Sequence, residues 1–150
     1  MNKNIDIALI KQADGTYDLE IENGDIKGVE SFDTAITMSV FCERRADVSE
    51  QPINYLRRGW WGNLLNDNEG FELGSKLWEF YQSRASQTVA NKIKTVLEEA
   101  FAWFVEDGYA TNVIVNTEYT GSNINISITI MRSNDVVGSR SFKLWENTGK

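Results

Sequence analysis

One segment near the end of the chain constrains the fold more than any other. Residues 124–130 alternate strictly between an isoleucine and a smaller polar residue, with isoleucines at Ile124, Ile126, Ile128 and Ile130. Successive side chains of a strand point to opposite faces, so this run predicts a strand with one apolar and one polar face. Val113 and Val115 begin a similar run before it, and a last strand is expected around Ser141 to Trp145. The sequence therefore predicts an antiparallel sheet that needs a cover on one side.

A long amphipathic segment, residues 86–108, is suited to cover that sheet. Ser86 is a typical N-cap residue, and Gly108 is a typical residue just beyond a helix C-terminus. At 100° per residue, the apolar side chains gather on one side of the helix. We expect the following residues to form a buried stripe against the isoleucine row: Val89, Ile93, Val96, Leu97, Ala100 and Phe104.

The first thirty residues predict a β-meander. Alternating apolar residues are interrupted by Asp14-Gly15 and Asn23-Gly24, and such pairs tolerate the positive φ of tight hairpin turns. Ser31 then predicts the start of a helix that runs to about Arg45, and Ser75 the start of a short one. The expected fold is a single α+β domain over residues 1–150. It has an N-terminal β-meander, two or three helices, and a C-terminal antiparallel sheet packed on the long helix.

Residues 46–74 show no lasting period, and long loops of this kind are often functional. They contain the densest motif of the chain, Arg57-Arg58-Gly59-Trp60-Trp61-Gly62. Two exposed indoles would be costly, so Trp60 and Trp61 are expected to be substantially buried in the assembled particle, at least one of them within this chain. They can pack the loop onto the domain's own core, or they can contact another subunit, since Trp and Arg dominate such contacts.

Four of the seven arginines lie around this loop in sequence, namely Arg44, Arg45, Arg57 and Arg58. In a chain with a net charge of −7 they can form a local basic patch. Alternatively, they pair within the chain with acidic neighbours, namely Glu43, Asp47 and Glu50. Both interpretations remain open at this point.

Composition excludes several function classes. Histidine is absent and Cys42 is the only cysteine, which removes the common nucleophile–histidine pairs and the usual zinc sites. The adjacent acids Glu98-Glu99 and Glu106-Asp107 diverge by roughly 100° on a helix and cannot converge on one bond. The acidic charge argues against nucleic acid as a partner. With no signal peptide and no run of ~18 apolar residues, we also expect no membrane contact. We therefore expect no enzyme, no cofactor and no metal.

Three blocks of the sequence resemble the Mu-like phage baseplate-wedge family, in the clan of the sheath initiators of contractile tails. The first runs from Thr34-Ala35 to Glu43-Arg44-Arg45-Ala46. The second is Arg58-Gly59-Trp60-Trp61-Gly62, followed by Gly74-Ser75-Lys76-Leu77-Trp78. The third joins Glu99-Ala100 and Trp103 to Asp107-Gly108. The chain departs from the family at Asn63, where an acid commonly follows the second glycine.

The resemblance implies a structural subunit of the inner baseplate wedge, located in the virion tail and assembled in the host cytoplasm. The implied partners are other wedge proteins and the tail sheath protein, and hub or tube proteins are further possible partners. The resemblance also implies six copies of this chain per baseplate. A free strand edge at the C-terminus would template the sheath by strand pairing. The expected contact residues are Arg44, Arg45, Arg57, Arg58, Trp60, Trp61, Phe142, Leu144 and Trp145.

Two other functions remain possible at this stage. One bacterial branch of the same clan sequesters an adaptor protein in the cytoplasm, which would make this chain a regulator. Baseplates can also carry cell-wall lytic enzymes, although the sequence offers no catalytic motif for one. Gene neighbourhood distinguishes the regulator from the baseplate subunit, because genes for baseplate subunits lie among tail genes. A peptidoglycan-digestion assay tests for the lytic enzyme.

Overall fold

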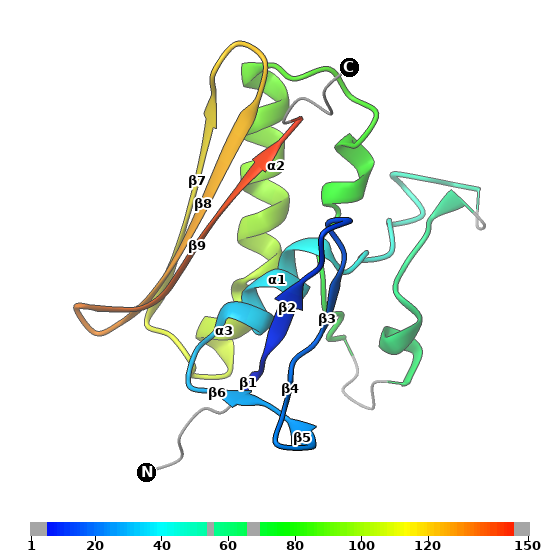
Figure 1. The fold of residues 1–150 in the computed structure, drawn as a ribbon. Helices are drawn as coiled ribbons and strands as arrows, with labels where there is room; N and C mark the ends of the chain where they lie inside the picture. Colours follow the sequence, from blue (N-terminus) through cyan, green and yellow to red (C-terminus); the bar gives the residue numbers. More distant parts are fainter. Residues whose placement is uncertain (1–5, 54–55, 66–69, 146–150) are drawn as a thin grey trace.

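The computed structural model describes residues 6–53, 56–65 and 70–145, and it is an α+β fold (Figure 1). The strands are β1 (Asp6–Ile7), β2 (Leu9–Lys11), β3 (Tyr17–Leu19), β4 (Ile21–Glu22), β5 (Asp25–Ile26), β6 (Gly28–Val29), β7 (Asn112–Tyr119), β8 (Ile124–Arg132) and β9 (Asp135–Leu144). The α-helices are α1 (Asp33–Phe41), α2 (Gln87–Ala100) and α3 (Ala102–Glu106), and the 3₁₀ helices are η2 (Trp61–Leu65) and η3 (Leu77–Phe80).

The C-terminal sheet has the order β7-β8-β9, and both pairings are antiparallel. All four isoleucines of β8 are buried, as the alternation predicts, and each contributes about 1.5–3 kcal/mol when removed from water. The last strand is longer than expected. It begins at Asp135 instead of near Ser141 and pairs with β8 along its length, with a register shift opposite Ile130 and Met131.

Helix α2 packs against this sheet through one face, as predicted (Figure 1). Its buried residues are Ala90, Ile93, Leu97 and Ala100, and Glu98 on the opposite side is exposed. Val96 was expected in the stripe but is only half-buried, because it lies at the margin of the arc that faces the sheet. Ala90, which was not in the predicted stripe, is buried as well, and its carbonyl accepts a hydrogen bond of 2.9 Å from the Thr117 hydroxyl.

The helix predicted over residues 86–108 is divided into two. Ser86 is the N-cap, and its side chain accepts a hydrogen bond from the Val89 N–H, as expected. Helix α2 ends at Ala100 because Phe101 leaves helical geometry at φ −99° and ψ 0°. The Phe104 N–H then bonds to the Phe101 carbonyl, three residues back, and α3 continues from there. Gly108 ends the segment at a φ of +78°, as predicted for this position.

Helix α1 is shorter than the sequence predicts at both ends. It starts after Phe32 rather than with Ser31 as its cap, and it ends at Phe41 rather than near Arg45. From Cys42 the backbone is extended, and a parallel bridge joins Glu43 to Ser75. These backbone pairings hold residues 42–46 in a conformation that competes with the helix. Ser75 lies one residue before the N-cap position of η3, which is Lys76, but its hydroxyl accepts a hydrogen bond of 3.2 Å from the Leu77 N–H at the start of that helix, as expected of a capping residue.

The N-terminal strands form three antiparallel pairs, of which two are hairpins and the third joins the first strand to the last, which closes the predicted meander. Strand β1 pairs with β6, β2 with β3, and β4 with β5. Three linking residues close a ring of backbone hydrogen bonds: Ala8 N–H to Lys27 O (2.8 Å), Lys27 N–H to Glu20 O (2.9 Å) and Glu20 N–H to Ala8 O (3.0 Å). Each extended segment therefore bends at its centre and pairs with both of the others. The predicted turn at Asn23-Gly24 is confirmed, with φ of 53° and 82°.

Helix α1 lies between the C-terminal layer and the N-terminal strands, with contacts to β1, β9 and α2. The long connection between α1 and η3 runs over the side of the molecule away from the C-terminal sheet (Figure 1). Within the described ranges, no helix combines the length and apolar character needed to cross a membrane.

Candidate functional site

The connection after α1 is organised by backbone pairing on both sides of residues 42–46. On one side, the Trp60 N–H donates to the Glu43 carbonyl (2.7 Å), and the Ala46 N–H donates to the Arg57 carbonyl (3.0 Å). On the other side, the Ser75 N–H donates to the Cys42 carbonyl (2.9 Å). Three stretches that are distant in sequence therefore lie side by side. Sequence periodicity cannot reveal such an arrangement, because each stretch is only a few residues long.

Two glycines are required for this close approach. Gly74 has a φ of +110°, and a Cβ built there would lie 2.2 Å from the Cys42 carbonyl oxygen. Gly62 lies under the Trp60 ring, whose nearest carbon would be 2.4 Å from an added Cβ. The second glycine of the double-tryptophan motif thus provides the surface on which Trp60 packs.

The two tryptophans have different environments. Trp60 is half-buried against Gly62, which agrees with the expectation that one indole packs within the chain. Trp61 is 68% exposed in this chain, so its burial would require another subunit and stays a prediction. Trp61 starts helix η2, and this short helix also exposes Leu64 (87%) and Leu65 (73%). We call Trp61, Leu64 and Leu65 the η2 surface.

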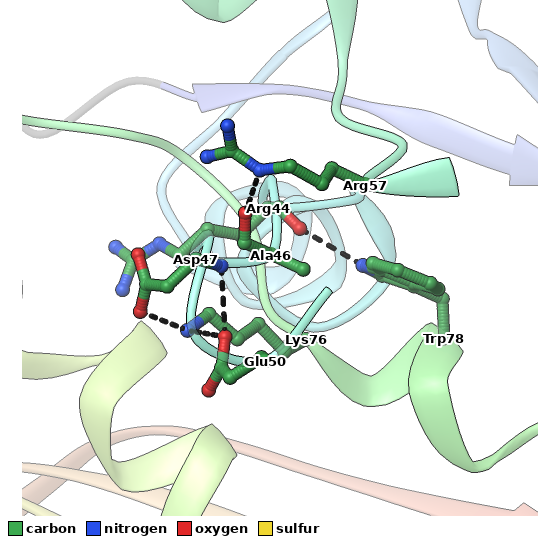
Figure 2. Close-up of polar contacts among 7 residues, drawn as sticks. All are labelled: Arg44, Ala46, Asp47, Glu50, Arg57, Lys76 and Trp78. Carbon is green, nitrogen blue, oxygen red and sulfur yellow. Dashed lines mark hydrogen bonds and ion pairs between the residues drawn. The ribbon is translucent and has the colours of Figure 1, made fainter. Parts of the chain in front are cut away.

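The four arginines do gather around the connection, and three of them bind backbone carbonyls. Arg44 Nη2 donates to the Glu72 carbonyl (2.6 Å) and Arg45 Nη1 to the Arg58 carbonyl (3.0 Å). Arg57 Nε donates to the Ala46 carbonyl (2.5 Å), as Figure 2 shows. These bonds satisfy carbonyl groups that no regular ladder satisfies.

Arg58 forms an ion pair with Glu43, one of the acids expected to pair with this cluster. Its guanidinium lies 3.2 Å from a Glu43 carboxylate oxygen and 5.1 Å from the centre of the Trp78 ring. Trp78 is fixed in turn, since its indole N–H donates to the Arg44 carbonyl (2.8 Å, Figure 2). The alternative of internal pairing is thus confirmed for Glu43. Asp47 and Glu50 bind Lys76 instead, a residue that sequence reasoning did not single out.

Lys76 is a buried cation between two carboxylates (Figure 2). Its Nζ lies 2.8 Å from Asp47 Oδ2 and 2.7 Å from Glu50 Oε2. Burial disfavours its charge, but the hydrogen bonds to Asp47 and Glu50 outweigh this effect and raise the pKa of Lys76. The same contact lowers the pKa of Asp47. The two acids therefore connect the start of the loop to the residue that precedes η3.

Asn63 occupies the position where the resembled family commonly has an acid. Its side-chain amide donates to the Leu73 carbonyl (3.0 Å) and accepts from the Leu73 N–H (2.9 Å). A carboxylate could accept the second bond but could not donate the first. Asparagine at this position is thus explained by the pair of hydrogen bonds, one donated and one accepted, that joins η2 to the segment before Gly74.

The η2 surface borders an open pocket of about 200 Å³. Its lining combines indole, guanidinium and carboxylate groups: Arg45, Arg58, Gly59, Trp60, Trp61, Asn63, Leu64 and Glu72. An apolar ring beside fixed cations and an acid suits a side chain of another protein. Among the described residues, no group of three or more Asp, Glu and Cys could hold a metal ion.

The C-terminal candidates lie on the other side of the molecule, at β9. Phe142 packs edge to face against Phe41, with the ring centres 5.0 Å apart. Leu144 and Trp145 are also half-buried against the core. These three side chains are therefore used within the chain, and what β9 offers outward is its backbone edge. The structure does not bring them together with the arginines and tryptophans of the connection.

Comparisons with known proteins identify relatives over most of the chain. The model of a family described as "Phage protein GP46" matches residues 32–137. "Mu-like prophage FluMu protein gp46" of Haemophilus influenzae is 29% identical over 117 residues, which cover 78% of this chain and 76% of that protein. "Baseplate protein gp46" of Escherichia phage Mu is 29% identical over 120 residues, which cover 75% of this chain and 77% of that protein.

Proposed function

The chain belongs to the phage protein GP46 family, and from this membership we propose that it is a structural subunit of a phage tail baseplate. The observation that carries the proposal is the similarity to the baseplate protein of phage Mu, which extends over three quarters of both chains. The matched residues 32–137 include the whole arginine–tryptophan connection and the packing of α2 on the sheet. Residues 1–150 act as one unit in this role, which is assembly rather than catalysis.

In finer detail, the chain is an inner wedge subunit of a contractile tail, of the sheath-initiator type, present six times per baseplate. The η2 surface and the pocket beside it contact a larger wedge protein. Exposed Trp61, Leu64 and Leu65 would be costly to leave in water, and a neighbouring subunit removes that cost. Arg45 and Arg58 at the rim give the contact its orientation, since charged groups at a rim act mainly on specificity.

The sheath is templated at β9, which is an outer strand of the C-terminal sheet. Residues of an antiparallel strand direct their backbone groups alternately to the two sides, so about half of those of β9 face away from β8. An incoming strand can pair with them without any specific side chain. Arg140 and Lys143 place positive charges on this strand, which opposes pairing between two copies of it.

A proline test separates the free edge from the paired side of β9. Adjacent residues direct their N–H groups to opposite sides, so only one of Arg140→Pro and Ser141→Pro removes a bond to β8. We expect that variant to lose stability. The other should keep a melting temperature near that of the parent and enter baseplates, yet give tails without extended sheath in electron micrographs.

The outcome of this test is decisive in both directions. Normal sheathed tails from the stable proline variant would contradict templating at β9. Purified tails that lack the chain altogether, as judged by immunoblot, would contradict the baseplate role itself. Removing the end of β9 would be a poorer test, because it would also remove Phe142 and Leu144 from the core.

A further inference from the structure

The three N-terminal strand pairs expose more apolar surface than their size explains. We call residues 6–30 the N-terminal module. It exposes Ile7, Ile10, Tyr17, Leu19, Ile21 and Ile26, and the exposed fractions reach 61% at Ile21. Scattered single exposures are normal on a protein surface, but six within 25 residues form a concentration that indicates an interaction site.

The register of the hairpins groups these side chains in pairs. Ile21 lies directly opposite Ile26, and Leu9 lies opposite Leu19. Residues opposite each other in an antiparallel pair share one face, so the β2–β3 and β4–β5 hairpins each carry an apolar pair on one side. In the β4–β5 hairpin, the other side carries the acids Glu22 and Asp25. The module therefore separates apolar from acidic surface within single hairpins.

The rest of the chain covers little of this module. Ala8 is its only buried residue among those described, and it lies at the ring of backbone hydrogen bonds. Attachment to α1 is by polar contacts: the Thr34 hydroxyl donates to the Ile7 carbonyl, and the Ala35 N–H donates to the Asp6 carboxylate (2.9 Å). Hairpins with strands of two or three residues are marginally stable without further packing. The apolar pairs thus remain for another molecule to bury.

The charge of the module indicates what that molecule is like. Residues 6–30 contain seven acids and two lysines, which gives −5 out of the −7 of the whole chain. Two such modules repel each other, so face-to-face pairing of two copies is disfavoured. A protein surface with an apolar centre and a basic rim matches both the exposed pairs and the charge.

We propose that the N-terminal module is a docking surface for another baseplate protein that presents a basic, apolar-centred face. This inference depends on the baseplate role proposed above. It concerns a different surface from the η2 surface, and it lies outside residues 32–137 that match the family model. The chain then bridges two partners, one at an acidic surface and one at a surface rimmed by arginines.

Accessibility of Ile26 in assembled tails tests this proposal directly. Cys42 is the only cysteine, so a Cys42→Ala background carries one label position at a time. Ile26→Cys probes the module, and Val105→Cys on α3 is the matched control, since the two parent side chains are 47% and 46% exposed. We expect maleimide to react with I26C at least about tenfold more slowly in tails than in the free chain, and with V105C at similar rates in both.

Three results would overturn the proposal: equal reaction of I26C in tails and in the free chain, equal slowing at both positions, or cross-linking to a second copy. If I26C fails to fold, Ile21→Cys gives the same test. A photo-reactive cross-linker on the same cysteine should capture one other tail protein, through peptides rich in lysine and arginine. Asp18→Lys/Asp25→Lys should reduce that capture about tenfold, while the control Glu98→Lys/Glu106→Lys leaves it unchanged.

The baseplate role and the docking surface can fail separately. If purified tails lack the chain, the proposed function is wrong. If tails contain it and I26C still reacts at the rate of the free chain, only the docking surface is wrong.

Discussion

Lys76 Nζ lies 2.8 Å from Asp47 Oδ2, and the two side chains differ greatly in exposure. The Lys76 side chain is 10% exposed, whereas that of Asp47 is 69% exposed and that of Glu50, its second partner, 42%. Loss of the lysine would therefore leave two carboxylates that water can still solvate. Loss of both acids would leave a buried ammonium group without a partner, which is the more costly state.

This difference in exposure predicts which of two variants has the lower free energy of unfolding in urea denaturation. Lys76→Met keeps the volume and apolar stem of the side chain, and we expect it to lower the free energy of unfolding by about 1 kcal/mol. Asp47→Asn/Glu50→Gln should lower it more. Lys94→Met removes an exposed pair with Glu98 and serves as the control, with an expected change of about 0.5 kcal/mol or less. A double acid variant that is more stable than Lys76→Met would contradict this explanation.

The same contact predicts how stability depends on pH. The hydrogen bond to Lys76 lowers the pKa of Asp47. The stability that the Asp47 carboxylate adds to the folded state is therefore present above the ordinary carboxyl pKa of about 4 and is lost as pH falls through the lowered value. The pKa of Lys76 is raised. The stability that its ammonium group adds to the folded state is therefore present below the ordinary lysine pKa of about 10.4 and is lost as pH rises through the raised value. The stability difference between the parent and Lys76→Met should thus be largest from about pH 5 to 10 and shrink at both extremes.

Gly74 predicts a second stability effect, with a control elsewhere in the chain. Gly74→Ala combines a φ of +110° with a Cβ placed 2.2 Å from the Cys42 carbonyl oxygen. Gly121 has a similar φ of +90° but no atom within 4 Å of an added Cβ. We expect Gly121→Ala to cost about 1 kcal/mol from backbone strain alone, and Gly74→Ala to cost at least about 3 kcal/mol. Equal melting temperatures for the two variants would contradict the steric explanation.

The C-terminal half of the fold could be predicted because its patterns are long. The isoleucine alternation and the helical stripe each extend over several residues, and together they specify which faces meet. The N-terminal ring and the true end of α1 could not be predicted in this way. Both depend on backbone bonds between distant residues, such as Trp60 N–H to Glu43 O, and strands of two residues have no measurable period.

The candidate site was predicted in its composition but not in its contacts. The gathering of Arg44, Arg45, Arg57 and Arg58 followed from their positions in sequence, yet three of them donate to carbonyl groups, which every residue has. Lys76 gave no signal, because a lysine beside a serine and a leucine is usually exposed. The exposure of Leu64 and Leu65 was missed for the opposite reason, since leucines are usually buried.

The two tryptophans provide the last prediction, because the chain itself offers the matched control. Trp60 packs over Gly62 and is half-buried, so Trp60→Ala should lower the free energy of unfolding by about 2–3 kcal/mol. Trp61 is mostly exposed, so Trp61→Ala should change it by less than about 0.5 kcal/mol. If the η2 surface contacts a wedge protein, Trp61→Ala should nevertheless reduce the amount of this chain in purified tails. A Trp61→Ala chain that enters tails at the parental level would limit both indoles to a role within the domain.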